Sequence, residues 1–192
     1  MSVTKTRDQL KKVFVGVSEF RFSTKSGKYD ASTVWDYELP ILRDSINFDN
    51  PAPTINKVFI HGDEKPYAST SEAADITLTL EIPSIHDDIT GFLYNKGSEV
   101  SNISDEVDGI AGTWSGQGIK LDNKVIEGMC MIISEDRKHA ILIKNLKGYS
   151  SMNMNELGTQ PVSFTLTCTL EGGVTTDTDG DVVFLDFTPT NA

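Results

Sequence analysis

The sequence predicts a mainly β protein, an antiparallel β-sandwich or partial barrel with one short α-helix and long loops. The main observation is that apolar and polar residues alternate without a break over residues 75–82 and 162–171. This period of two is typical of a strand that buries one face. Two further apolar stretches, residues 125–134 and 139–148, are joined by a polar turn of hairpin length. With 192 residues, of which 38% are hydrophobic, we expect a single domain over residues 1–192.

The N-terminal part of the chain is predicted to be an arm followed by a strand. Residues 1–12 are polar and basic, and we expect an arm or a short helix there because no strong cap is present. Val13 to Phe22 then follow a strand-like pattern with apolar residues on both faces. This pattern predicts that both sides of the strand are covered.

Residues 23–53 are the least regular region and are predicted to be a long interaction loop. Loops of this length are uncommon unless they have a function. The region carries many large apolar groups, which either cover the domain's own core or form a surface for a partner, and the residues alone leave both interpretations open. The candidates for contact with another subunit are Trp35, Tyr37, Leu39, Ile41 and Leu42.

Two strands separated by a polar turn follow the long loop. Ile55 to His61 is predicted to be a short strand, and residues 62–71 the polar turn after it. The alternating stretch over residues 75–82 comes next. It ends at Pro83, which cannot donate a backbone hydrogen bond to a neighbouring strand.

One helix is predicted, over Ile85–Asn95. Ser84 can accept a hydrogen bond as its N-cap, and Gly97 is a natural stop at its C-terminal end. The next segment, residues 99–118, is acidic and rich in Gly and Ser around Trp114. We therefore expect this segment to be a loop.

The hairpin over residues 125–148 is apolar on both faces. Its first strand directs Met129, Met131 and Ile133 to one side. The residues directed to the other side are Ile126, Cys130 and Ile132. A strand that is apolar on both faces is buried on both, so we expect cover on each side of this hairpin.

The C-terminal part contains the strand over residues 162–171, a turn and a last short strand over Val182–Phe187. The acidic run 177–181 begins like a calcium-binding loop. However, Val182 occupies the place of the turn glycine and Thr188 that of the bidentate acid. A hairpin turn around Asp179 and Gly180 is the favoured interpretation.

Charge and the scarcity of reactive side chains exclude several classes of function. The chain has 28 acidic and 17 basic residues, which argues against binding to nucleic acid but not against a surface past which DNA moves. Its three histidines are far apart, and we find no metal, cofactor or nucleophile motif, so we expect no enzyme and no cofactor. No stretch is apolar enough to enter a membrane, and we expect Cys130 and Cys168 to be buried thiols in a soluble protein.

The polar faces of the two alternating strands are the main functional clue. They carry hydroxyls and acids without Lys or Arg, at Asp75, Thr77, Thr79, Glu81, Ser163, Thr165, Thr167, Thr169 and Glu171. An ordinary solvated sheet face carries long side chains of both charges. The commoner explanation is that threonine is a good exposed strand former. The alternative is a smooth functional wall.

Taken in this order, the elements resemble the major tail tube proteins of tailed bacteriophages and the related tube-forming protein of type VI secretion. The similar elements are the first strand and long loop (13–53), the polar-faced strand (75–82), the helix (85–95), the hairpin (125–148) and the closing strand (162–171). The segment Leu39 to Ile46 also looks like the part of those proteins that enters the next strand. Residues 99–118 have no counterpart in this pattern.

The resemblance implies a structural virion protein that forms homohexameric rings. In that family the rings stack into a tail tube for DNA delivery, together with other tail proteins, and each subunit adds strands to a continuous inner β-barrel. The residues of the two polar faces would line the lumen, where their acids repel phosphate, so that DNA passes without specific binding. The resemblance further implies assembly in the host bacterial cytoplasm and a place in the virion tail, without membrane insertion.

Two other functions remain open from the sequence. A monomeric β-sandwich module for carbohydrate binding or adhesion would use Trp35, Tyr37 and Trp114 as a stacking platform on loops. A tail completion protein of the same fold would end the tube instead of building it. The first alternative predicts a stable monomer, whereas the tube predicts rings or filaments.

Overall fold

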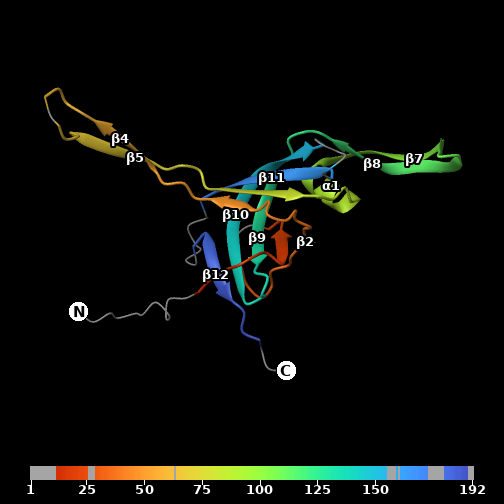
Figure 1. Cartoon of the computed structure of the whole chain (residues 1–192), viewed down its shortest axis with the longest axis horizontal. Helices are drawn as coiled ribbons and strands as arrows, with labels where there is room; N and C mark the ends of the chain where they lie inside the picture. Colours follow the sequence, from red (N-terminus) through yellow and green to blue (C-terminus); the bar gives the residue numbers. More distant parts are fainter. Residues whose placement is uncertain are drawn as a thin grey trace.

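The structure, a computed structural model, describes residues 12–25, 29–62, 64–154, 159, 161–172 and 180–189. These residues form an eight-stranded sheet, two separate two-stranded hairpins and one short helix (Figure 1). The pairings between the described strands are antiparallel, which confirms the predicted mainly β fold. The predicted N-terminal arm, apart from Lys12, and the calcium-loop candidates at residues 177–179 lie outside the described residues.

The large sheet takes strands from both halves of the chain. They are β1 (Glu19–Ser23), β2 (Tyr37–Glu38), β3 (Asn47–Asp49), β6 (Thr77–Ile82), β9 (Ile126–Ile133), β10 (His139–Asn153), β11 (Ser163–Leu170) and β12 (Val182–Asp186). Across the sheet the order is β2-β1-β9-β10-β11-β6-β3, and β12 pairs with β10 off this path. The alternating stretches predicted from the sequence are therefore confirmed as β6 and β11, and the predicted hairpin as β9 and β10.

Residues 39–46 join the two edges of the sheet. They link β2 to β3, which follow one another in the chain but lie at opposite ends of the strand order. The Leu39 N–H donates to the Phe20 carbonyl on β1, and the Leu42 N–H donates to the Glu81 carbonyl on β6, both at 2.9 Å. Because three residues span at most about 10 Å, β1 and β6 must lie close together. The sheet is thus curled into a partial barrel that the described strands do not close.

Strand β10 bends and changes its pairing partner on one side. Its first part, residues 139–143, pairs with β12, whereas its second part, residues 146–153, pairs with β11. Between the two parts the register against β9 shifts, and Asn145 adopts a positive φ of 54°. This bulge changes the direction of the strand. In Figure 1, β9 and the first part of β10 run across the direction of β11 and β6.

The main core lies inside the curled sheet. Its aromatic and aliphatic members come from most strands of the sheet and from the helix; they include Phe20, Phe22, Leu39, Leu78, Leu80, Ile82, Phe92, Leu93, Ile143, Leu146, Phe164 and Leu166. Cys130 and Cys168 are buried free thiols, as expected. Burial raises the pKa of both, to about 12 for Cys168, so both remain protonated at neutral pH.

A second, smaller cluster covers the opposite face of the β9–β10 hairpin. It consists of Met129, Met131 and Leu142, with Tyr29, Trp35, Ile133, Ala140, Val183 and Leu185 packed against it. Ile126, Cys130 and Ile132 face the main core instead. The predicted cover on both sides of this hairpin is therefore confirmed, and it comes from the long loop and from β12 of the same chain.

The helix, α1 (Asp87–Leu93), is shorter than predicted. The ring Nδ1 of His86 accepts the Asp88 N–H, so His86, not Ser84, is the N-cap. The helix ends at Tyr94, whose extended backbone leads directly into a strand, so Gly97 is not its stop. Phe92 anchors the helix to the sheet, with ring centroids 5.1 Å from Phe22 and 4.6 Å from Tyr37.

Two hairpins project from the sheet. Of their four strands the sequence predicted one, over Ile55–His61, which is observed as β4 (Thr54–Val58). Residues 99–118, predicted to be a loop, lie in a long hairpin of β7 (Asn95–Val107) and β8 (Ile110–Lys120). The predicted polar turn over residues 62–71 contains the start of β5 (Ala68–Glu72), which pairs with β4. Gly and Ser are tolerated in these strands because most of their residues are exposed, although Ile119 on β8 packs against the main core. We refer to the two hairpins as the β7–β8 arm and the β4–β5 arm.

The N-terminal strand also begins later than predicted. β1 starts at Glu19, and the three valines before it are exposed, at 58% for Val13, 64% for Val15 and 43% for Val17. Within the described residues nothing covers this apolar stretch on its valine side. Phe14, by contrast, packs against the main core.

Candidate functional site

The two polar strand faces that the sequence singled out form one continuous surface. In the pairing of β6 with β11, Glu81 lies opposite Thr165, Thr79 opposite Thr167, and Thr77 opposite Thr169. Directly opposed residues of an antiparallel pair share a face of the sheet. Asp75 and Glu171 are exposed beyond the ends of these strands, whereas Ser163 is buried at 4% exposure. We call this surface the polar wall.

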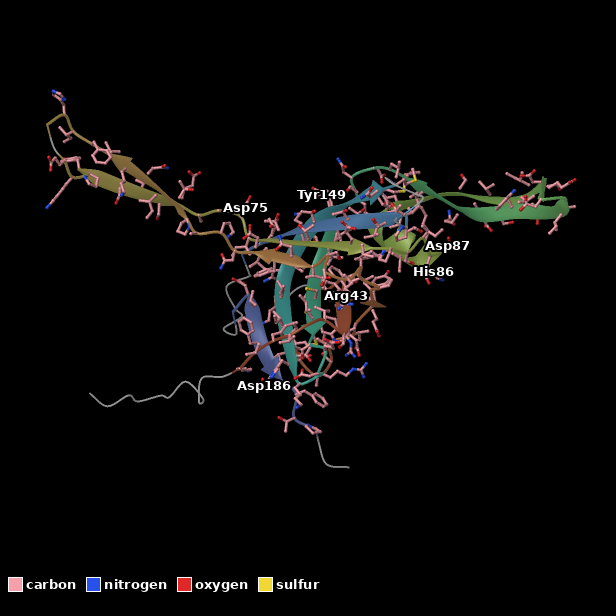
Figure 2. All side chains as sticks on the ribbon, viewed as in Figure 1. Arg43, Asp75, His86, Asp87, Tyr149 and Asp186 are labelled. Atoms are coloured by element: carbon pink, nitrogen blue, oxygen red, sulfur yellow. The ribbon has the colours of Figure 1, made fainter. Side chains whose placement is uncertain are left out.

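The polar wall continues onto both neighbouring strands. On β3, Asn47 lies opposite Thr79 and Asp49 opposite Thr77. On β10, the residues opposite Thr165, Thr167 and Thr169 are Ser151, Tyr149 and Lys147. Figure 2 shows Tyr149 at this part of β10 and Asp75 where the chain enters β6 from the β4–β5 arm. Tyr149 and Ser151 were not predicted because the second hairpin strand was expected to end at Gly148, whereas β10 extends to Asn153. Asn47 and Asp49 lie in the segment that was expected to be a long loop.

The sequence predicted polar strand faces without lysine, but Lys147 on β10 lies on the polar wall. Its Nζ lies 3.1 Å from Glu127 Oε1 and 3.9 Å from Glu171 Oε1. The hydrogen bond to Glu127 and the charges of both acids raise the pKa of Lys147, so its charge is permanent at neutral pH. Since two carboxylates flank this one cation, and Asp49, Asp75 and Glu81 lie on or next to the same face, the wall stays acidic.

The candidates for contact with another subunit pack on the core of their own chain. Leu39 is only 3% exposed and belongs to the main core. Tyr37 and Ile41 pack against the same core, and Trp35 packs against the second cluster. Leu42 is half-buried beside β6. Only the outer surface of this loop, which includes Val34 at 59% exposure, is accessible to another chain.

The two arms offer much more accessible apolar surface. β4 and β5 are exposed along their whole length, and so is most of β7 and β8. The large exposed apolar side chains of the arms are Ile55, Val58, Phe59, Ile60, Tyr67, Val100, Ile103, Val107, Ile110 and Trp114. A two-stranded hairpin is marginally stable by itself in water. Figure 1 shows the arms leaving opposite ends of the sheet.

A groove of about 760 Å³ follows the gap in the partial barrel, between the start of β1 and residues 38–46. Its charged lining is largely paired, because Glu19 accepts hydrogen bonds from Arg21 and lies 3.1 Å from Arg137. Among the described residues, no group of three or more His, Cys, Asp or Glu side chains could hold a metal ion. No helix in the described ranges is long and apolar enough to cross a membrane.

No protein-family model matches this chain, and no curated protein matches it either.

Acid should loosen the attachment of β12 to β10. Asp186 on β12 accepts a hydrogen bond from Lys12 and lies 2.8 Å from His139 Nδ1 on β10. The Lys12 and His139 hydrogen bonds lower the pKa of Asp186 below its ordinary 3.8. Because the pKa of Asp186 is lower in the folded state than in the unfolded state, its ionised carboxylate stabilises the fold at pH values above 3.8. This stabilisation is lost as the pH falls from 3.8 through the pKa of the folded state.

We therefore expect Asp186→Asn to lower the urea midpoint at pH 6 and to lower it less at pH 3, below the ordinary pKa of 3.8. Urea unfolding at a series of pH values measures this difference. Asp44→Asn is the control, because the Asp44 side chain is 92% exposed and lies 3.9 Å from Arg43, so it should change the midpoint little at any pH. An Asp186→Asn effect that is the same at both pH values would contradict the ion pairs.

Proposed function

We propose that this chain is a structural protein that assembles with copies of itself into stacked hexameric rings, forming a phage tail tube through which DNA is delivered. The observation that carries the proposal is the polar wall, a continuous surface over β3, β6, β11 and the second part of β10 that consists mainly of hydroxyls and carboxylates and includes Lys147. The resemblance of the element order to tail tube proteins supports the same function. The virion location and the partnership with other tail proteins are part of this proposal.

The composition of the wall suits a surface past which DNA slides. Threonine and serine hydroxyls are short and uncharged, and the acids repel phosphate. Each close pair of like charges costs about 1 kcal/mol in water at about 4 Å, and salt screens the repulsion over about 10 Å at 0.1 M. Lys147 is held by Glu127 and Glu171, so it offers little free positive charge to a phosphate.

The open edge of the sheet supports assembly. Beyond β6 the sheet ends at β3 (Asn47–Asp49), and among the described residues no further strand pairs with the outer edge of β3. Exposed sheet edges favour pairing with other chains, and closure into a barrel removes them. In the proposed ring, the strands of the wall from each subunit complete one inner β-barrel with the wall facing the lumen.

The carbohydrate-binding alternative has less support. Its three aromatic side chains do not share a surface: Tyr37 packs on the main core, Trp35 on the second cluster, and Trp114 lies on the β7–β8 arm. A tail completion protein has the same geometry as a tube protein. It would form a single ring that does not elongate.

The assembly test is electron microscopy and sedimentation of the purified chain over a wide concentration range. We expect sixfold rings or tubes at high concentration or after addition of preassembled tail tips as seeds. A chain that stays monomeric under both conditions would rule out the tube, and single rings that never stack would favour the completion protein.

Reversing charge on the wall should turn a repelling lumen into a binding one. In the variant with Asp75→Lys, Glu81→Lys and Glu171→Lys, we expect assembled tubes to retain DNA and to deliver genomes less well than the parent. DNA retention by filter binding and genome delivery measure the two effects. The control reverses three exposed acids outside the wall, at Glu38, Asp44 and Asp88. Triple-variant tubes that bind no DNA and deliver normally would show that the wall does not face the lumen.

A further inference from the structure

The end of the β7–β8 arm has one apolar face. In its pairing, Ile103 lies opposite Trp114, Asp105 opposite Gly112, and Val107 opposite Ile110. Alternate residues of paired strands share a face, so these six residues form one surface. The four apolar members are each between 49% and 73% exposed. The other face carries Ser104, Glu106, Ala111 and Thr113, so the end of the arm is amphipathic.

The apolar face of this arm holds a single, fixed negative charge. The Asp105 Oδ2 accepts the indole N–H of Trp114 at 2.8 Å, and its Oδ1 accepts the Glu106 N–H at 2.8 Å. Both hydrogen bonds lower the pKa of Asp105, so the carboxylate is ionised at neutral pH. A shallow hollow of about 340 Å³ lies beside it, lined by Asp105, Val107, Asp108, Ile110, Gly112, Thr113 and Trp114. At Gly112 and Gly116 no other atom lies within 4 Å of where a Cβ would be, so the space next to the Trp114 strand is open.

The β4–β5 arm carries a face of the opposite charge. Ile55 lies opposite Ser71, and Lys57 lies opposite Ser69. These four residues share a face on which Lys57 is the charged residue and the serines on β5 are small. Ile55 is 60% exposed. An exposed isoleucine and a lysine between short hydroxyl side chains make a surface of small side chains with one positive charge, which complements the charge of Asp105.

One chain cannot bring these two faces together, because its arms extend in opposite directions from the sheet (Figure 1). A contact between different surfaces of identical chains is heterologous, and such contacts repeat into closed rings or open filaments. We propose that the apolar face of the β7–β8 arm binds the Ile55–Lys57 face of the β4–β5 arm of a second copy, with Lys57 paired to Asp105. This inference rests on the proposed self-assembly and names the surfaces that perform it.

The charge pair allows a direct test by reversal. Lys57→Glu and Asp105→Lys should each weaken self-association of the full chain by at least tenfold, measured by analytical ultracentrifugation. An equimolar mixture of the two variants should assemble again. In alternating copies, the two reversed charges meet at one contact, and the unchanged Lys57 and Asp105 meet at the next. The double variant should also assemble by itself. Glu106→Lys is the matched control on the opposite face of the same arm, and it should leave association unchanged.

The arms are exposed, so the variants should keep the fold, which circular dichroism and urea midpoints verify. If Asp105→Lys disturbs the arm, Asp105→Asn keeps an acceptor for the Trp114 N–H while it removes the charge, and it should weaken association less strongly. If the parent assembles but neither reversal matters, or if only one of them does, the two arms do not bind each other and the docking is wrong while the tube remains. If the parent never associates, both proposals fail.

Discussion

Gly148→Ala should destabilise the fold by about 2–3 kcal/mol, the upper range for adding one carbon atom to a packed interior. Gly148 pairs with Ile126 on β9 and with Cys168 on β11. A Cβ there would overlap the Thr167 carbonyl oxygen and come within 2.6 Å of the Cys168 Cα. These are backbone atoms in the middle of the sheet, so relief requires that β10 and β11 move apart.

Urea unfolding of the two proteins measures the effect. Gly172→Ala is the matched control, because nothing lies within 4 Å of the Cβ position at Gly172 and its φ is not positive. Its free energy of unfolding should stay within about 0.5 kcal/mol of the parent. If Gly148→Ala unfolds at the same urea concentration as Gly172→Ala, then β10 and β11 do not approach each other this closely.

Leu39→Ser should cost about 3–5 kcal/mol of folding free energy. Leu39 is 3% exposed in the main core, and removal of a buried leucine side chain costs about 2–5 kcal/mol. The serine hydroxyl adds the cost of a buried polar group. The variant is therefore expected to unfold as a monomer before any effect on assembly can be seen.

Val34→Ser is the control in the same loop, because Val34 is 59% exposed and its replacement should change stability by less than about 0.5 kcal/mol. Urea melts at low protein concentration measure the monomer without the contribution of assembly. If Leu39→Ser is as stable as the parent but does not assemble, then Leu39 serves a neighbouring subunit and not its own core.

Local patterns in the sequence predicted the strands that bury one or both faces. The alternation around Leu78 and Leu166 predicted β6 and β11, and the two apolar faces around Cys130 predicted the covered β9–β10 hairpin. In these strands the period of two comes directly from contact with the core. The face that the core leaves free was therefore also predictable, which is why Thr77 and Thr167 were placed among the site candidates.

Three of the four arm strands were not predicted, because the arms are mostly exposed and, of their residues, Ile119 packs against the core. Without a buried face, nothing selects for alternation, and Gly and Ser are tolerated. One local signal was available: Asp108 and Gly109 both adopt positive φ, 51° and 78°, and Asp-Gly between two apolar residues is a strong sign of a hairpin turn. The place of Lys147 on the wall depended on pairing between distant strands, which no local pattern contains.

The joint between the polar wall and the β4–β5 arm has a mechanical consequence. β3 leads into β4 through residues 50–53, and β5 leads into β6 through residues 73–76, so the arm extends the same ribbon that carries one side of the wall. Pro51 and Pro53 fix two backbone angles in the first connection. Because this connection is stiff, a rotation of the β4–β5 arm would also rotate β3 and β6. A neighbouring chain that binds the arm would therefore affect the orientation of the polar wall. In the proposed ring, contacts made by the β4–β5 arm, outside the sheet, would therefore set the orientation of β3 and β6 in the wall of the lumen.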